Sequence, residues 1–251
     1  MHVGLATGFA HQRGDTYDDA RFLREEIDNL VLAEELGFDS VWITEHHFSD
    51  YSMSNDPVQL LTYVAAKTRH VKLGTQCIIV PWHHPVRLAE RIVNLDILSN
   101  GRAILGFGGG LSQHEFAGLG IDMSDSRQMY LGNTMRAAIK NYHLDTPGVF
   151  PTIKGYEHYE KMVLAPEAIE PYVADFAKGA VTGTPQMILE RLWELKEIFK
   201  PQGLVPHLYY GGMPQDEARK NMHLFAEKVL PELKSWEAET SIDDRFLEAA
   251  E

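Results

Sequence analysis

The sequence predicts an α/β fold in which helices cover a parallel sheet. Short, almost continuously apolar runs alternate with longer segments whose apolar residues recur at helical spacing, and glycine and proline residues separate the two. Continuous apolar character is typical of parallel strands because both of their faces are buried. The strand-like runs are VGLATG at 3–8, FDSVWIT at 38–44, HVKLGTQCIIVP at 70–81, RAILGFG at 102–108 and LVPHLYY at 204–210.

Residues that favour helix ends delimit the helical segments. Glycine suits the left-handed backbone that follows many helices, and proline suits the first helical turn, where its missing N–H is not needed. The predicted boundaries are an end at Gly37, a start at Asp56-Pro57, a start at Pro85 with an end at Asn100-Gly101, and a start at Thr184-Pro185. One last helix is predicted from the spacing of Met222, Phe225, Val229 and Leu233.

The alternation of strands and helices fails between about Ser126 and Gly183. This stretch is punctuated by glycine and proline and contains no convincing buried strand. The chain therefore offers five strand-like runs, whereas a closed (β/α)₈ barrel has eight strands. Because the sequence shows neither a low-complexity linker nor a longer repeat, we expect one domain over residues 1–251.

Composition excludes several classes of protein. With 44% hydrophobic and 24% charged residues the chain is globular, and its formal net charge of −13 argues against nucleic acid or anionic membranes as main partners. Cys77 is the only cysteine, so an intrachain disulfide is impossible. The sequence also lacks a signal-peptide pattern and an apolar stretch long enough to span a bilayer. We expect a cytoplasmic protein.

Two adjacent histidine pairs follow neighbouring strands. Glu45, His46 and His47 come after the second strand, and His83-His84 comes after the third. Because the carboxyl ends of parallel strands meet at one edge, these side chains are expected to share one mouth. Their spacing does not place two ligands on one helix face, so no metal site is expected. The alternative is a polar loop whose histidines are solvated or pair with nearby carboxylates.

The fourth strand runs into GFGGGL, residues 106–111. This stretch fails as a dinucleotide-binding fingerprint, because Leu111 occupies the third glycine position and no helix is predicted to open there. Two readings stay open. The stretch is either a flexible turn or bare backbone that lets a flat ring or a phosphate approach closely.

The motifs together resemble the bacterial luciferase-like, flavin-dependent monooxygenases. The resemblance covers most of residues 1–130 and 180–235, through GFDSVWITEHHFSDYSMSNDP, VKLGTQCIIVPWHHPVRLAERIVNLDILSNGRAILGFGGG, GIDMSDSR and GTPQMILERL. It implies a TIM-type barrel, reduced FMN delivered by a separate flavin reductase, and O₂ chemistry through a C4a-peroxyflavin that oxygenates a small organic substrate. It also implies a homodimer formed through residues 56–68 and 86–98.

The resemblance assigns roles to particular residues. His46 matches the catalytic histidine of the family, a residue whose titration near neutral pH suits proton transfer, and His47 supports it. Gln76-Cys77 matches a non-proline cis peptide beneath the flavin ring. Arg127 matches an arginine that holds the FMN phosphate, a task that suits a guanidinium. The alternative readings are a small strand residue for Cys77 and, for Arg127, a surface ion pair with Asp122 or Asp125.

Further cofactor-binding positions implied by the resemblance are Ala6 and Thr7 after the first strand and Gly108 and Gly109 after the fourth. The family pattern has a cysteine where Gly108 stands and a phosphate-binding arginine where Gly109 stands. Both of those side chains are therefore absent from this sequence. One phosphate contact and the reactive thiol of the family pattern are missing with them.

The middle of the chain departs most from the family. Strands five to seven and a phosphate loop should follow GIDMSDSR, but residues 131–162 resemble a later family segment. We expect either a break near Tyr130 that leaves those strands out or a true deletion, and we favour the break because the later segment continues in register. Two other functions stay open: a non-catalytic flavin-binding protein and a deazaflavin-dependent oxidoreductase.

Overall fold

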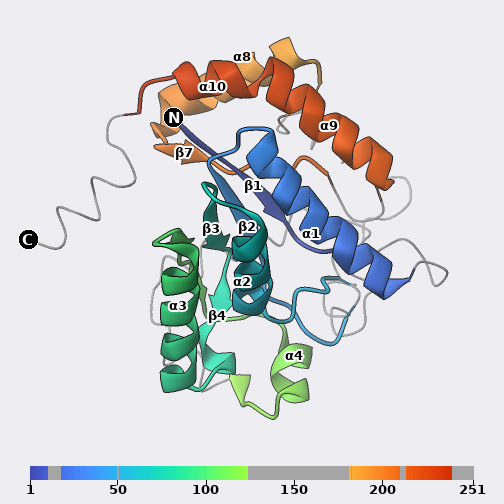
Figure 1. The fold of residues 1–251 in the computed structure, drawn as a ribbon, viewed down its shortest axis with the longest axis vertical. Coiled ribbons are helices and arrows are strands. Elements are labelled where there is room, and N and C mark those ends of the chain that lie inside the picture. The colour runs from blue at the N-terminus through green and yellow to red at the C-terminus, as the bar shows by residue number, and fades with distance from the viewer. Residues whose placement is uncertain (11–17, 50, 124–180, 182, 210–212, 239–251) are drawn as a thin grey trace, which may run out of the picture.

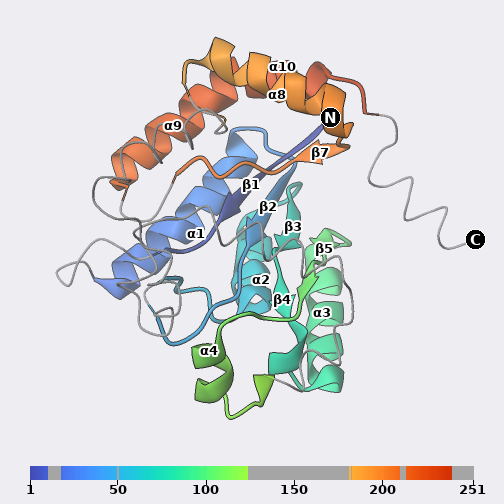
Figure 2. The ribbon, with the colours of Figure 1, turned by 180° about the vertical axis from the view of Figure 1, so that it is seen from behind.

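The computed structural model describes residues 1–10, 18–49, 51–123, 181, 183–209 and 213–238. A five-stranded sheet has the order β5-β3-β2-β1-β7, and all of its neighbouring strands are parallel (Figures 1 and 2). Its strands are β1 (His2–Thr7), β2 (Ser40–Ile43), β3 (Lys72–Thr75), β5 (Ala103–Ile104) and β7 (Gly203–Leu204). The predicted parallel α/β architecture is confirmed.

A second, two-stranded parallel sheet pairs β4 (Ile78–Ile79) with β6 (Phe107–Gly108). The predicted runs 70–81 and 102–108 thus each form two short strands instead of one. At the division the Thr75 hydroxyl replaces a ladder partner, because its Oγ1 donates to the Gly106 carbonyl (3.0 Å) and accepts from the Gly106 N–H (2.9 Å). Between the two sheets, the hydrogen bonds that join these two segments are thus made by the Thr75 side chain instead of its backbone.

Helices of the described residues follow the predicted boundaries closely. They are α1 (Asp19–Glu35), α2 (Pro57–Lys67), α3 (Pro85–Ser99), α4 (Gln113–Gly118), α8 (Pro185–Phe199), α9 (Gln215–Lys228) and α10 (Leu230–Ser235), with a short 3₁₀ turn at Val80–Trp82. The predicted stop at Gly37 has a φ of 84°, and Asp56 caps α2 by accepting the N–H of Gln59 at 2.9 Å. These predicted helix ends are confirmed. They can be found in the sequence because each signal acts within one turn of the chain.

Two predictions about helices were wrong. A helix, α4, does open after the glycine-rich stretch, and Ser112 caps it by accepting the N–H of Glu115. The last helix is divided into α9 and α10, with Val229 between them. Pro231 lies in the first turn of α10, and since proline has no N–H it cannot continue the hydrogen bonding of a preceding helix.

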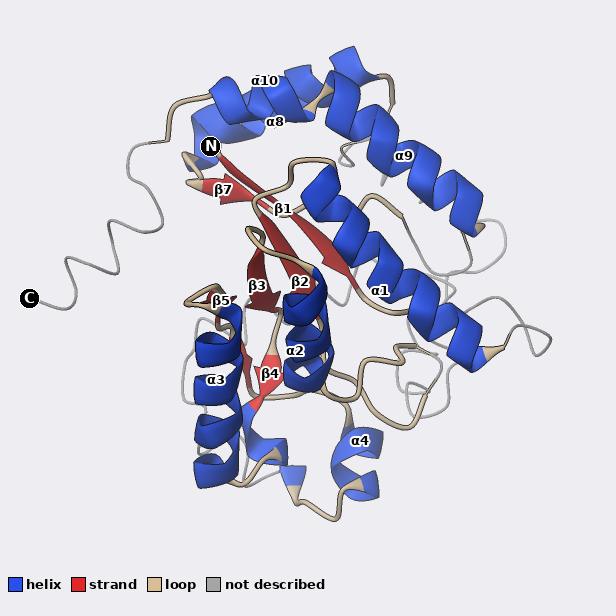
Figure 3. Ribbon diagram, viewed as in Figure 1, coloured by secondary structure: helices blue, strands red, loops and turns tan. Residues whose placement is uncertain are grey.

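The sheet buries one face against α1 and α2, which lie across it in Figure 1. The strand register places Leu5, Val41 and Leu73 side by side on this face, and each is fully buried. Leu30 of α1 and Leu61 of α2 belong to the same core. Figure 3 shows α8, α9 and α10 gathered beyond the β7 edge of the sheet. The helix-covered core therefore holds β1, β2 and β3 in fixed register.

The opposite face of the sheet carries the row Ala6, Trp42, Gly74 and Ile104. The Trp42 indole lies over the neighbouring strands, where a Cβ at Gly74 would come within 2.3 Å of it and one at Gly4 within 2.7 Å. Only glycine permits this close approach. In the described residues the sheet ends at β5 and β7, so closure into an eight-stranded barrel remains a prediction.

The expected lack of strands between about Ser126 and Gly183, and the proposed break near Tyr130, fall almost entirely within 124–180, outside the described residues. Of the helices in the described ranges, none has the length and apolar character needed to cross a membrane.

Candidate active site

One histidine of each pair, His47 and His83, lies against Glu45, which follows β2. Its side chain is fully buried, and its Oε1 lies 2.7 Å from Nε2 of His83 and 3.5 Å from Nε2 of His47. Its Oε2 accepts the N–H of Ile79 at 2.6 Å. The predicted shared mouth is confirmed for His83. It is wrong for His84, which is exposed at the start of α3 because the chain turns into the helix there.

Burial and hydrogen bonding have opposite effects on the pKa of Glu45. Burial alone would raise the pKa of its carboxyl, but His47, His83 and the Ile79 N–H together hold the pKa below its usual value. Hydrogen bonds to a carboxylate favour its charged form. Glu45 is therefore an anion at neutral pH, and it lies between His47 and His83.

A second buried carboxylate, Glu115 of α4, holds the first histidine pair. Its Oε1 lies 3.2 Å from Nδ1 of His46 and accepts the backbone N–H of His47 at 2.6 Å. The His46 ring also makes an edge contact with Tyr51, with centroids 4.8 Å apart. Sequence reasoning missed Glu115, although the Ser-x-x-Glu pattern of a helix start was present at Ser112.

The His47 ring lies in an aromatic environment. Its centroid is 5.2 Å from Trp82, which in turn contacts Phe116 at 5.4 Å. Nε2 of His47 approaches Glu45 at 3.5 Å but forms no hydrogen bond of acceptable geometry, and Nε1 of Trp82 and Oγ of Ser49 are likewise buried without partners among the described residues. Buried polar atoms without partners are rare in proteins, so three in these neighbouring loops set this part of the described chain apart.

Arg91 of α3 extends the network away from Glu45. Its Nη1 lies 3.5 Å from Nδ1 of His83, and its Nη2 donates to Oδ1 of Asp56, the residue that caps α2. The contacts run from the start of α2 through Arg91 and His83 to Glu45. They tie two helices of the outer layer to the carboxyl ends of β2 and β4.

The bond between Gln76 and Cys77 is cis, as the resemblance implied. Gln76 is exposed and Cys77 half-buried. A Cβ at Gly108 would lie 2.5 Å from the Cys77 sulfur, so the thiol occupies the space that a side chain at 108 would need. Burial, with Glu45 nearby, raises the pKa of the Cys77 thiol. The thiol is therefore protonated at neutral pH and is a weak nucleophile.

The other expected cofactor positions divide between the two faces of the sheet. Ala6 lies on the face opposite α1, whereas the Thr7 hydroxyl donates to buried Glu26 of α1. Gly109 is half-buried directly after β6, and Arg127 lies outside the described residues. Where the chain is described, its histidine, cysteine, aspartate and glutamate side chains form no group of three or more that could hold a metal ion.

The family model described as luciferase-like monooxygenase matches residues 1–131, slightly more than half of the chain. The chain belongs to this family. It is 34% identical over 119 residues to the alkanal monooxygenase alpha chain of Photorhabdus luminescens, covering 45% of this chain and 33% of that protein. It is 36% identical over 111 residues to limonene 1,2-monooxygenase of Rhodococcus erythropolis, covering 44% of this chain and 29% of that protein.

The chain thus spans about a third of the length of these curated relatives. Among solved structures, monooxygenase RslO1 from Streptomyces bottropensis superposes with a TM-score of 0.69 at 21% identity, over 93% of this chain and all of that one. At this identity the likeness shows the fold alone. The family is therefore the one that the motifs of the sequence implied, and the parallel α/β fold agrees with it.

Proposed function

We propose that the chain is a flavin-dependent monooxygenase that uses reduced FMN and O₂ to oxygenate a small organic substrate. The observation that carries the proposal is the pair of buried carboxylates, Glu45 and Glu115, which bracket His46 and His47 at the carboxyl ends of the strands. This is the edge at which parallel α/β folds place their chemistry. Membership of the luciferase-like family supports the same conclusion.

The residues around His47 fit the ring system of a flavin. The Trp82 Nε1–H has no hydrogen-bond partner among the described residues, Nε2 of His47 has only the 3.5 Å approach to Glu45, and Ile79 and Phe116 are buried apolar residues nearby. A flavin ring has polar edges and apolar faces, which matches this mixture. We assign the ring to this place, together with the Ala6, Gln76-Cys77 and Gly108-Gly109 backbone, and the phosphate to Arg127.

When bound, reduced FMN would react with O₂ and supply the oxygen atom that the substrate receives. His46 holds and moves the proton that this chemistry requires. Its Nδ1 donates to Oε1 of Glu115, 3.2 Å away, so Nε2 is the nitrogen that exchanges a proton with the reactants. The His46 side chain is 18% exposed, which leaves it reachable from the mouth. His47 positions the neighbouring ring.

A separate flavin reductase is the proposed source of reduced FMN. The test is anaerobic titration of the protein with reduced FMN, followed by a pulse of oxygen and spectroscopy on the millisecond scale. We expect saturable binding and an oxygen-dependent transient in flavin absorbance. Tight binding without a transient would favour a non-catalytic flavin-binding protein. Binding of a reduced deazaflavin but not of FMN would favour the deazaflavin-dependent alternative.

We also propose that the chain forms a homodimer through α2 and α3, in agreement with the expectation for residues 56–68 and 86–98. Val86, Val93 and Ile97 lie on one face of α3 and are 59%, 53% and 67% exposed. Tyr63 of α2 is 56% exposed. Large apolar side chains exposed on neighbouring helices are typical of a protein interface.

Light scattering at micromolar concentration should therefore give the mass of a dimer. Replacing both Val93 and Ile97 by glutamate should yield a folded monomer, because the interface would have to bury two unpaired charges. Leu224→Glu is the matched control, since Leu224 is 47% exposed on α9, and it should leave the mass unchanged. A wild-type protein that elutes as a uniform monomer would contradict the proposal.

A further inference from the structure

We propose that Arg91 selects one tautomer of His83, that this tautomer requires an ionised carboxylate at position 45, and that Arg91 and Glu45 thereby act as positioning residues for His47. The test that measures turnover rests on the proposed function, whereas the test that measures the tautomer of His83 does not. None of the three side chains, Arg91, His83 and Glu45, is part of the proton transfer assigned to His46. Their effect is on the geometry of the site.

The first step concerns the His83 ring. A guanidinium carries only hydrogen-bond donors, so a nitrogen that faces it must act as an acceptor. Nη1 of Arg91 lies 3.5 Å from Nδ1 of His83, and a proton on Nδ1 would point a donor at a cation. Nδ1 therefore carries the lone pair. The single ring proton lies on Nε2, and it donates to Oε1 of Glu45 at 2.7 Å.

The second step concerns Arg91 itself, which is fixed in place. Its other terminal nitrogen, Nη2, donates to Oδ1 of Asp56, and the same oxygen accepts the N–H of Gln59 at the start of α2. The side chains of Arg91 and Asp56 are 33% and 28% exposed, so both are partly shielded from solvent. The guanidinium therefore cannot turn away from His83 without leaving its carboxylate partner.

The third step concerns Glu45. Its Oε2 accepts a peptide N–H from Ile79, which is always a donor, and its Oε1 accepts from His83, which Arg91 has made a donor. Both oxygens must therefore be acceptors. An ionised carboxylate meets this demand, whereas the amide of a glutamine would place its NH₂ against one of the two donors. In a site this buried, such an opposition is costly.

The consequence reaches His47 through Oε1 of Glu45, which lies 3.5 Å from His47 Nε2. Glu115, the second buried carboxylate of the site, holds the His47 backbone N–H and the His46 ring. Glu45 is thus the carboxylate that faces the His47 ring. With the edge contact to Trp82, it sets the orientation of that ring beside the site assigned to the flavin.

The direct test is nitrogen NMR of the protein labelled at histidine, without flavin, at neutral pH. We expect His83 to show a protonated Nε2 and an unprotonated Nδ1 in the wild type and in Glu45→Gln, where Arg91 alone still faces Nδ1. The double variant Glu45→Gln/Arg91→Met should give a mixture of the two tautomers, because neither the carboxylate nor the guanidinium then fixes the ring. Arg87→Met, which removes an exposed arginine one turn earlier on α3, should leave the His83 signals unchanged. A wild-type His83 protonated on Nδ1 would overturn the proposal, whether or not the protein is an oxygenase.

The second test is a double-mutant cycle on turnover with reduced FMN and O₂. Glu45→Gln should lower kcat by about tenfold or more, because a donor opposes a donor in the buried site. Adding Arg91→Met should restore part of that loss, since His83 can then change tautomer and accept from the glutamine NH₂. Additive losses in the double variant would contradict the mechanism, because a merely structural role for Arg91 cannot produce a rescue.

Discussion

Replacing His46 by alanine is expected to lower turnover by about 10²-fold or more while flavin binding stays largely intact. The side chain supplies the proton transfer assigned to the site, and Glu115 at 3.2 Å sets which of its nitrogens does so. Alanine removes both functions without creating a charge. The measurement is oxygenation under single-turnover conditions, combined with anaerobic titration of reduced FMN to give the binding constant separately from the rate.

His47→Ala is the internal control for this prediction. The His47 ring contacts Trp82 and Glu45, so its loss should disturb the arrangement of the site and affect binding and rate together. Loss at His46 should fall on the rate alone. Unchanged oxygenation in the His46 variant would remove this residue from the mechanism, and equal effects of both variants on binding would indicate that His46 serves only to shape the site.

The helix ends were predictable from local chemistry, and the sheet from the regular alternation of strands and helices. Asp56 followed by Pro57 predicts the start of α2 from two residues, and Gly37 predicts the end of α1 from one. The alternation of apolar strands with amphipathic helices predicts parallel pairing in the same way. The helix ends are decided within a few residues, whereas the parallel pairing joins residues as far apart as Gly4 and Ser40 and is found from the order of strands and helices along the chain.

The partners of the candidate site were not predictable, because they depend on distances through space. Glu115 is separated by 69 residues from His46, and nothing in the letters between them indicates that α4 turns its carboxylate toward β2. His83 and His84 look equivalent in the sequence. Only the turn at Val80–Trp82 directs the first toward Glu45 and leaves the second at the exposed start of α3.

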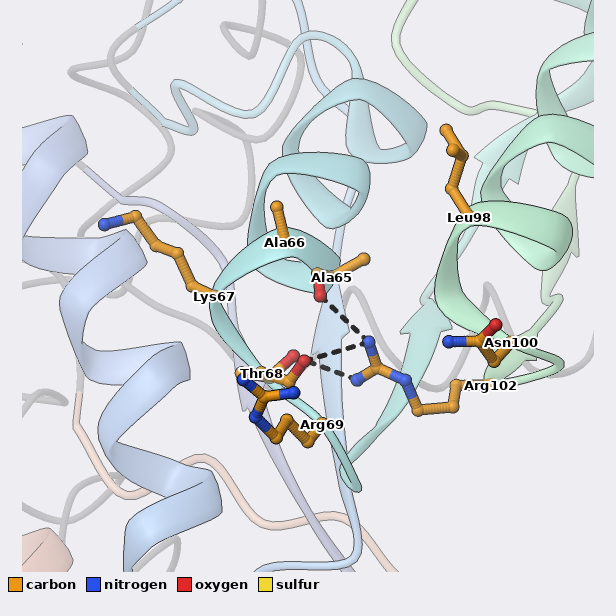
Figure 4. Close-up of a pocket in the computed structure, with 8 residues that line it drawn as sticks. All are labelled: Ala65, Ala66, Lys67, Thr68, Arg69, Leu98, Asn100 and Arg102. Atoms are coloured by element: carbon orange, nitrogen blue, oxygen red, sulfur yellow. Dashed lines mark hydrogen bonds between the residues drawn. The ribbon is translucent and has the colours of Figure 1, made fainter.

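Replacing Arg102 is expected to reduce stability strongly. It precedes β5 and borders a cavity of about 300 Å³ near the end of α2 (Figure 4). The cavity lies toward the amino ends of the strands, away from the histidine pairs that follow their carboxyl ends. The Arg102 guanidinium and Nε donate to the carbonyls of Ala65, Thr68, Val71 and Ser99 and to the Thr68 hydroxyl. One side chain thus joins α2, α3 and the start of β3.

Arg102→Ala should lower the free energy of unfolding by about 3 kcal/mol or more, because several buried carbonyls would lose their donor at once. Arg102→Lys should recover part of the loss, since one ammonium can satisfy only some of the acceptors. Arg69→Ala is the matched control: its side chain lines the same cavity but is exposed, and its removal should change stability by less than about 0.5 kcal/mol. Urea unfolding of the full chain measures all three, and equal losses for Arg102→Ala and Arg69→Ala would show that the buried carbonyls do not depend on Arg102.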